Sequence, residues 1–345
     1  MNRRELMHRA LACGISTATL PSWAYASVPL PKPEKTELTL GVGGASLLYY
    51  LPLSIAERCG FFEQEGLRVT VNDFGAGSVA LQALIGDNVD AVAGAYEHTL
   101  RMQQKGIDVK AVCELDRFPG ICIGVRSDLG DRIKSIADLK GLNIGVTAPG
   151  SSTAMVLQYA LIRAGLTPDA ASLIAVGGGA SAVAAIKNRE IDAISHVEPV
   201  ISRLQADGDI TLLLDGRTEQ GTQALFGSAS PAGTVYLKRE FIDTYPATTQ
   251  RLVNAFFKAL QWIQQASAKD VAKTVPEAYL LGDAQLYQRA FEASKPMYST
   301  TGIIGTNAFR GLLEMLRKVD PSLAKAQISY AQTFDSTFVK KRQTL

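Results

Sequence analysis

Short apolar runs alternate with amphipathic segments along most of this chain. Residues 37–42 alternate apolar and polar side chains and predict a strand, as residues 67–71 do further on. Between them, residues 52–59 have helical spacing and end at Gly60. Strands and helices continue in this order up to Cys113, so we expect a parallel sheet covered by helices on both faces.

The same pattern occurs twice. A shift of 102 residues places residues 89–92 on residues 191–194, two similar strand segments. The same shift places the glycine loop at residues 75–77 on the one at residues 177–179. Two copies of one pattern predict two similar α/β lobes. Because ligands of open α/β sheets bind at the carboxyl ends of the strands, the predicted ligand site is the cleft between the lobes.

This organisation divides the chain into five parts. Residues 37–126 are predicted to form the first part of lobe 1, and residues 127–227 to form lobe 2. Residues 228–345 are expected to return to lobe 1 and end in helices, since no third copy of the repeat follows. A Pro-rich linker at residues 27–36 and an export signal at residues 1–26 precede the lobes.

The first 26 residues have the pattern of a secretory signal. The twin Arg3-Arg4 precedes a weakly apolar segment at residues 10–20, and Ala24 and Ala26 form a small-x-small cleavage site. We expect cleavage after Ala26, and the sequence leaves open whether the signal is of the Tat or the Sec type. No later run reaches the roughly 20 apolar residues of a membrane span. The mature protein is therefore expected to be soluble and periplasmic.

Composition narrows the function classes. The chain is 47% hydrophobic and 20% charged, which is enough apolar material for two domains, and no Lys or Arg cluster suggests a nucleic-acid partner. Three cysteines follow the signal. Two of them, Cys113 and Cys122, flank a turn signal at residues 117–120. If these cysteines lie on paired strands, their side chains face one another. The sequence leaves open whether they form a disulfide or remain buried thiols.

Motifs of catalysis and cofactor binding are missing from the sequence. His98 and His196, the histidines after the signal, lie in no zinc-binding spacing. The glycine pattern at residues 41–46 lacks the last glycine of a dinucleotide fingerprint. Gly150 is followed by Ser151 rather than by the lysine of a P-loop. We expect no catalytic residue, no metal and no cofactor, and therefore a binding protein rather than an enzyme.

The loops after the strands supply neutral hydrogen-bond donors instead. The strand at residues 142–146 turns through Pro149 and Gly150 into a helix that begins with three hydroxyl residues. First-turn N–H groups and the helix dipole favour an anion there, although a serine at a helix start also serves as an N-cap. The candidate ligand-binding residues are Gly44, Ser46, Ala76, Gly77, Ser78, Tyr96, Thr147, Ser151, Ser152, Thr153, His196 and Glu198.

Three of these candidates have structural alternatives that the sequence does not decide. Tyr96 is equally consistent with a half-buried aromatic residue. His196 fits a hydrogen-bonded structural histidine better than a catalytic base, because no nucleophile accompanies it. Glu198 stands before Pro199 and either begins a helix or receives an N–H group of a ligand.

Several motifs together resemble a known family. They are Glu-Arg-Cys-Gly-Phe-Phe at residues 57–62, Glu-Gly-Leu at residues 65–67 and Asp-Leu-Lys-Gly at residues 138–141. With the export signal and the repeat, they resemble the solute-binding proteins of nitrate/sulfonate/taurine-type ABC importers, which include binders of thiamine-precursor pyrimidines. The resemblance implies a two-lobed periplasmic-binding-protein fold of type II with a hinge. It also implies a monomer that closes on a small organic anion and delivers it to an inner-membrane permease.

One feature of the predicted cleft departs from an anion site. No arginine stands in the candidate loops to clamp a sulfonate or a carboxylate. A pyrimidine or another uncharged or aromatic molecule therefore remains an alternative ligand. The resemblance also extends to pyrimidine-synthesising enzymes of the thiamine pathway, which have this fold. The cysteine cluster of such enzymes is missing from this sequence. Sensing through a partner receptor is the remaining alternative.

Overall fold

A computed structural model describes residues 30–227 and 229–343. The predicted signal peptide at residues 1–26 lies outside the described residues. The chain divides into two units, Met1–Leu30 and Pro31–Leu345, and every element described below belongs to the second. Among the described residues, no helix combines the length and the apolar character needed to cross a bilayer.

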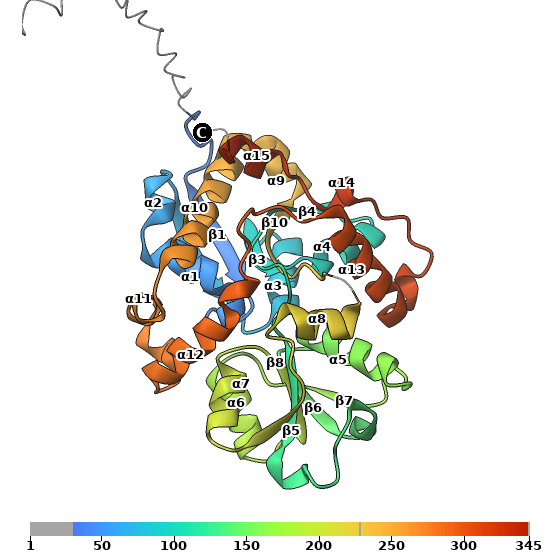
Figure 1. The fold of residues 1–345 in the computed structure, drawn as a ribbon. Helices are drawn as coiled ribbons and strands as arrows, with labels where there is room; N and C mark the ends of the chain where they lie inside the picture. Colours follow the sequence, from blue (N-terminus) through green and yellow to red (C-terminus); the bar gives the residue numbers. More distant parts are fainter. Residues whose placement is uncertain (1–29, 228, 344–345) are drawn as a thin grey trace, which may run out of the picture. The chain divides into compact units, whose positions relative to one another are not determined.

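Within residues 30–227 and 229–343, ten strands form two sheets, which we call lobe 1 and lobe 2 together with the helices that cover them (Figure 1). The strands of lobe 1 are β1 (Glu37–Val42), β2 (Arg68–Asp73), β3 (Ala91–Ala95), β4 (Val109–Glu114) and β10 (Gly233–Lys238). The strands of lobe 2 are β5 (Cys122–Arg126), β6 (Asn143–Val146), β7 (Ser172–Ala175), β8 (Ala193–His196) and β9 (Ile210–Leu214).

The helices fall into three groups along the chain. Lobe 1 begins with η1 (Leu48–Tyr50), α1 (Leu51–Arg58), α2 (Phe61–Gln64), α3 (Gly77–Ile85) and α4 (Glu97–Gln104). Lobe 2 contains η2 (Ser127–Leu129), η3 (Ile136–Leu139), α5 (Ser152–Arg163), α6 (Ala180–Lys187), α7 (Val200–Ala206) and α8 (Glu219–Phe226). The C-terminal third contains α9 (Arg239–Thr244), α10 (Pro246–Gln265), α11 (Ala268–Thr274), η4 (Glu277–Leu280), α12 (Ala284–Ser294), η5 (Lys295–Met297), α13 (Thr306–Val319), η6 (Pro321–Leu323), α14 (Tyr330–Thr333) and α15 (Thr337–Gln343).

The two sheets have the same topology. The strand order is β2-β1-β3-β10-β4 in lobe 1 and β7-β6-β8-β5-β9 in lobe 2. In each sheet the fourth strand runs antiparallel to both of its neighbours, whereas the first three strands are parallel. The sheets are therefore mixed, and the two-lobed α/β fold predicted from the repeat is confirmed.

The chain changes sheets twice. It crosses from β4 to β5, and it returns to lobe 1 at β10 after α8. The sequence assigns residues 122–126 to the first part of lobe 1, whereas β5 pairs with β8 and β9 in lobe 2. Cys113 in β4 and Cys122 in β5 thus lie in different sheets, and both are buried free thiols. The paired-strand arrangement considered for a disulfide between them is wrong.

The longest helix, α10, packs on lobe 1. Its buried positions include Leu252, Phe256, Leu260 and Ile263, which recur at helical spacing along one face. This face contacts α1 and α2 from the start of the chain and α15 from its end (Figure 1). The C-terminal third therefore holds α1 and α2 in place on lobe 1.

Candidate ligand-binding site

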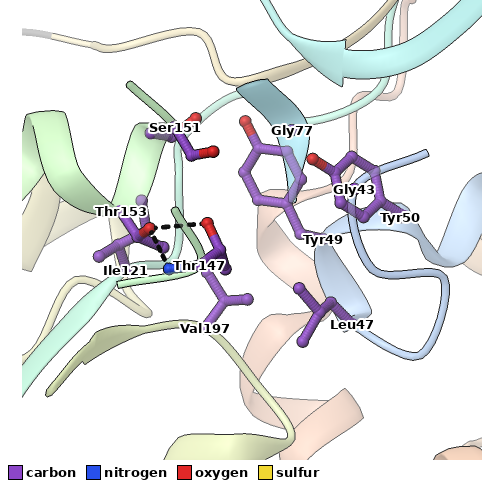
Figure 2. A pocket seen from close by; sticks show the side chains of 11 residues that line it. Gly43, Leu47, Tyr49, Tyr50, Gly77, Ile121, Thr147, Ser151, Thr153 and Val197 are labelled. Atoms are coloured by element: carbon purple, nitrogen blue, oxygen red, sulfur yellow. Dashed lines mark hydrogen bonds between the residues drawn. The ribbon is translucent and has the colours of Figure 1, made fainter. Parts of the chain in front are cut away.

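A cavity of about 320 Å³ lies between the two lobes. It is lined by Gly43, Leu47, Tyr49, Tyr50, Gly77, Ile121, Thr147, Ser151, Ser152, Thr153 and Val197 (Figure 2). The centre of a water molecule can move within only about 20 Å³ of it, which is roughly the room that one water needs. The structure thus shows lobes that are closed around a nearly filled site.

The floor of the cavity on the lobe 1 side is built from two backbone loops. The carboxylate of Asp73, at the end of β2, accepts hydrogen bonds from the N–H groups of Gly44 (2.8 Å) and Gly75 (2.9 Å). A Cβ atom on Gly43 would lie 2.5 Å from the Cα atom of Gly77. Only glycine allows this approach, so these residues hold the β1 loop against the start of α3.

Two adjacent tyrosines from η1 face the cavity. The rings of Tyr49 and Tyr50 pack edge to face, with centroids 4.9 Å apart, and both residues are buried. The hydroxyl of Tyr49 has no hydrogen-bond partner among the described residues. Burial raises the pKa of both phenols above the usual value, so both remain neutral donors. Figure 2 shows their hydroxyls on the side of the cavity opposite Thr147 and Thr153.

The lobe 2 side is the turn from β6 into α5. The hydroxyl oxygen of Thr153 accepts a hydrogen bond from the backbone N–H of Thr147 at 3.0 Å, and the two threonine hydroxyls are 2.9 Å apart (Figure 2). The hydroxyl of Ser195 in β8 donates to the carbonyl oxygen of Thr153 at 2.8 Å. These bonds set the position at which the uncompensated N–H groups of the first turn of α5 meet the cleft.

The hydroxyls at the start of α5 reach across to lobe 1. The hydroxyl oxygen of Ser151 accepts a hydrogen bond from the backbone N–H of Ser78 at 3.0 Å. The hydroxyl of Ser152 donates to the carboxylate of Glu97 at 2.6 Å. Ser151 occupies the N-cap position of α5, yet its side chain makes no capping bond to its own helix. In this closed form, the hydroxyls join the two lobes.

Other hydrogen bonds strengthen this closed arrangement. The backbone N–H of Leu48 donates to the carbonyl oxygen of Glu198 at 2.9 Å. The guanidinium of Arg101 donates to the carbonyl oxygen of Gly150 at 3.2 Å. Each bond joins residues of opposite lobes, so separation of the lobes would break all of them.

The structure brings together a part of the candidate set. The candidates that line the cavity are Gly77, Thr147, Ser151, Ser152 and Thr153. Those that belong to the adjoining loops or helix starts without lining the cavity are Gly44, Ser46, Ala76 and Ser78.

Tyr96 and His196 point into their own lobes. The hydroxyl of Tyr96 lies 2.7 Å from that of Thr333 in α14, and the ring is fully buried. The Nε2–H of His196 donates to the carbonyl oxygen of Gly177 at 3.0 Å. Burial lowers the pKa of His196 below its usual value, so the imidazole is neutral at pH 7. Neither side chain is among those that line the cavity.

Glu198 belongs to an ion-pair network behind the cleft. Its carboxylate accepts hydrogen bonds from the N–H and the hydroxyl of Ser202, and from Arg217 at 3.0 Å. Burial raises the pKa of Glu198, while these partners act in the opposite direction. Arg217 also pairs with Asp215, so the network ties α7 to the segment after β9.

Sequence reasoning missed several residues of the cavity wall. They are Gly43, Leu47, Tyr49, Tyr50, Ile121 and Val197. The position of the tyrosine pair in the sequence could have indicated its place in the wall. Residues 49–50 lie between the loop after β1 and the proline at the start of α1. Among the described residues, no group of three or more His, Cys, Asp or Glu side chains is arranged to hold a metal ion.

Comparisons with known proteins agree with this architecture. A family model described as the NMT1-like family matches residues 31–276. The solved structure of a protein from Bordetella bronchiseptica RB50 is 43% identical, with a TM-score of 0.88 over 91% of this chain and 99% of that one. The alkanesulfonate-binding protein SsuA from Xanthomonas axonopodis pv. citri, bound to MOPS, is 21% identical, with a TM-score of 0.72 over 88% of this chain and 99% of that one.

Two characterised relatives are of different kinds. The nitrate/nitrite binding protein NrtA from Nostoc sp. is 24% identical over 293 residues, which are 77% of this chain and 64% of that protein. The 4-amino-5-hydroxymethyl-2-methylpyrimidine phosphate synthase from Schizosaccharomyces pombe is 26% identical over 238 residues, 66% of this chain and 65% of that protein. In each case the match spans slightly less than two thirds of the relative.

Proposed function

The chain belongs to the NMT1-like family, and on that premise we propose that it is the solute-binding component of an ABC importer. The observation that carries this proposal is the cavity between the lobes, which both lobes line with neutral hydrogen-bonding groups. Such groups hold a small solute by short-range contacts that are readily reversed. Reversible binding is what delivery to a membrane permease requires.

Opening of the lobes is the proposed route of entry. The chain crosses between the sheets at two places, after β4 and before β10, and these crossings would act as the hinge. The bond between Ser78 and Ser151 and the bond between Glu97 and Ser152 would break when the lobes separate. A solute that contacts both lobes would stabilise the closed form by its differential affinity for it.

The proposed ligand contacts come from both lobes. They are Tyr49, Tyr50 and Gly77 from lobe 1, with Thr147, Ser151, Ser152 and Thr153 from lobe 2. The start of α5 supports an anionic group, as the sequence predicts, and SsuA and NrtA are named for sulfonate and nitrate ligands. No Lys or Arg belongs to the residues that line this cavity, so an anion there would rest on hydroxyl and N–H groups.

The location of the protein follows from the same proposal. A binding protein for an importer acts outside the cytoplasm, in agreement with an export signal cleaved after Ala26. We expect a monomer in the periplasm that meets an inner-membrane permease. N-terminal sequencing of the protein recovered from the periplasm would test the cleavage site, and a mature chain that begins elsewhere would contradict it.

Ligand screening tests the proposed function directly. The protein is partly unfolded and refolded to remove carried-over solute, and sulfonates, nitrate, aromatic acids, amines and pyrimidines are then added in a thermal-shift assay. Stoichiometric binding accompanied by a smaller radius of gyration in X-ray scattering is the expected result. A compound that binds without any change in scattering would contradict closure of the lobes.

The second candidate is an enzyme of the pyrimidine-synthase type, which the relative from S. pombe brings into consideration. The same screen separates the two functions when bound compounds are incubated and analysed by mass spectrometry. Recovery of each ligand unchanged supports a binding protein. Accumulation of a new product that requires the intact cavity would favour the enzyme instead.

A further inference from the structure

A second cavity adjoins the first. Tyr49 and Ser152 line both, so this pair separates two compartments of the space between the lobes. The second compartment encloses about 230 Å³ of space between atoms, of which the centre of a water molecule can reach only about 10 Å³, and it is walled mainly by apolar side chains. Those that matter here are Met155, Phe226, Leu312 and Met315. The compartment therefore suits an aliphatic or aromatic body better than it suits an inorganic ion.

Glu97 is the charged side chain in these walls. Among the residues that line either compartment, none is Lys, Arg or His, and no other is acidic. Glu97 is 2% exposed, and its carboxylate accepts the hydrogen bond from Ser152. Among the described residues, no Lys or Arg forms an ion pair with it, and Arg101 on the same helix pairs with Asp320. Burial therefore raises the pKa of Glu97, against the bond to Ser152 and the charge of Arg101, because a buried carboxylate without a paired cation is costly.

Two other buried polar side chains are also incompletely satisfied. The hydroxyl of Tyr49 is buried and has no hydrogen-bond partner among the described residues. Both carboxyl oxygens of Asp116, at the first crossing between the lobes, are likewise buried without a partner there. Burial raises the pKa values of Glu97 and Asp116, so each carboxyl holds its proton more readily than an exposed one does. A protonated amine beside Glu97 would supply the counter-charge that this buried carboxyl lacks.

On the basis of the proposed solute-binding function, we propose that the ligand is a small organic amine with an apolar body. Its protonated amine donates to the carboxylate of Glu97 at the junction of the two compartments. Its aliphatic or aromatic body lies against Phe226 and Leu312 once these walls move apart, because the compartment is nearly filled in the closed form. The unpaired hydroxyl of Tyr49 donates to any acceptor that the ligand carries.

Three compounds with one carbon skeleton test the charge preference. The full chain, refolded to remove carried-over solute, is titrated calorimetrically with 2-phenylethylamine, 2-phenylethanol and 2-phenylethanesulfonate. We expect the amine to bind at least tenfold more tightly than the alcohol and the sulfonate to bind more weakly than either. A sulfonate that binds more tightly than the amine overturns the proposal and leaves solute binding intact.

Glu97→Gln isolates the role of the carboxylate. The amide oxygen of glutamine still accepts from Ser152, so the contact between the lobes is kept while the charge is removed. We expect the amine to lose at least tenfold in affinity and the alcohol to lose less than threefold. The matched control is Glu114→Gln, since Glu114 is also buried, accepts from the hydroxyl of Ser299 at 2.6 Å and lines neither compartment. It should leave both affinities unchanged.

The remaining outcomes also decide the question. Equal losses for the amine and the alcohol in Glu97→Gln would mean that Glu97 acts only through the lobe contact, and would overturn the amine proposal. If none of the three probes binds, the molecule released by denaturing the protein as purified from its host is identified by mass spectrometry. A base retained in a one-to-one ratio supports the proposal, and an acid overturns it. Release of no molecule would count against solute binding itself.

Discussion

The hydroxyl oxygen of Ser151 accepts a hydrogen bond from the backbone N–H of Ser78 at 3.0 Å, although the two residues belong to opposite lobes. Ser151→Ala removes this acceptor and leaves the N–H group unpaired when the lobes close. We expect ligand binding to weaken by about 1–3 kcal/mol, because the closed form loses a partly buried hydrogen bond and leaves its donor unpaired. Calorimetric titration of the bound solute measures this loss.

A serine elsewhere in lobe 2 controls for a general loss of stability. The hydroxyl of Ser135 bonds to Asp138 at the start of η3 and does not line the cavity. Ser135→Ala should lower the free energy of unfolding by about 1 kcal/mol, as the loss of a capping interaction does, while affinity stays the same. If both variants lower the free energy of unfolding and neither changes the affinity for ligand, Ser151 does not join the lobes on ligand binding.

Gly43→Ala tests the close approach of two backbone loops. The added Cβ atom would lie 2.5 Å from the Cα atom of Gly77, and backbone atoms cannot move aside as a flexible side chain can. We expect unfolding to become easier by about 1–3 kcal/mol, as overpacking of a dense site does, and the ligand to bind more weakly. Denaturant unfolding and titration check the two effects. Gly305→Ala is the control, since its Cβ atom would meet nothing within 4 Å; its cost should stay below about 1 kcal/mol.

Glu114 makes stability depend on pH. Burial raises its pKa to about 7, from 4.5 for an unperturbed glutamate, against the opposing effect of its bond to Ser299. Between these two values the folded chain keeps a proton that the unfolded chain has released. The free energy of unfolding therefore falls as pH rises through this window, by roughly 3 kcal/mol in total for this group.

Comparison with Glu114→Gln isolates that contribution. The other buried carboxyls remain in both proteins, so the difference between the two stability profiles reports on Glu114. The variant should gain on the wild type as pH rises from about 4.5 to 7 and then keep its advantage. Urea unfolding at intervals of half a pH unit measures the profiles. Parallel profiles would show that Glu114 ionises normally.

Arg217 neutralises a buried carboxylate behind the cleft. Glu198 is 2% exposed and lies 3.0 Å from the guanidinium of Arg217. Arg217→Met leaves this carboxyl without its cation and should lower the free energy of unfolding by about 3 kcal/mol. Adding Glu198→Gln should recover a large part of the loss, because the charge that needed the partner is then gone. Additive effects in this double-mutant cycle would contradict the pairing.

The sequence predicts the fold as far as local patterns repeat. The copies at residues 89–92 and 191–194 correspond to β3 and β8, which pair in parallel with the opening strands of their sheets. The place of β5 is not predictable in this way. Residues 122–126 would form an apolar strand in either sheet, and their pairing with residues 193–196 and 210–214 is decided by contacts far away in sequence.

The candidate site shows the same division. Thr147 and Ser151 are predictable because a strand that turns into a helix places them at the carboxyl edge of the sheet. Tyr96 has an equivalent position after β3, yet its side chain turns to Thr333, near the C-terminus. Tyr49 lines the cavity and Glu97 lines the second compartment because tertiary packing orients η1 and α4. No periodicity encodes that orientation.

The insertion of β10 between β3 and β4 has a consequence for synthesis. The strands of lobe 2 are contiguous in the chain, whereas lobe 1 lacks its fourth strand until residues 233–238 have been made. At ribosomal speeds, the intervening residues take roughly ten seconds to appear. For that time β3 and β4 present unpaired edges to their surroundings. The lobe that is translated first is thus completed last, and holding chaperones have their best opportunity to bind the nascent protein there.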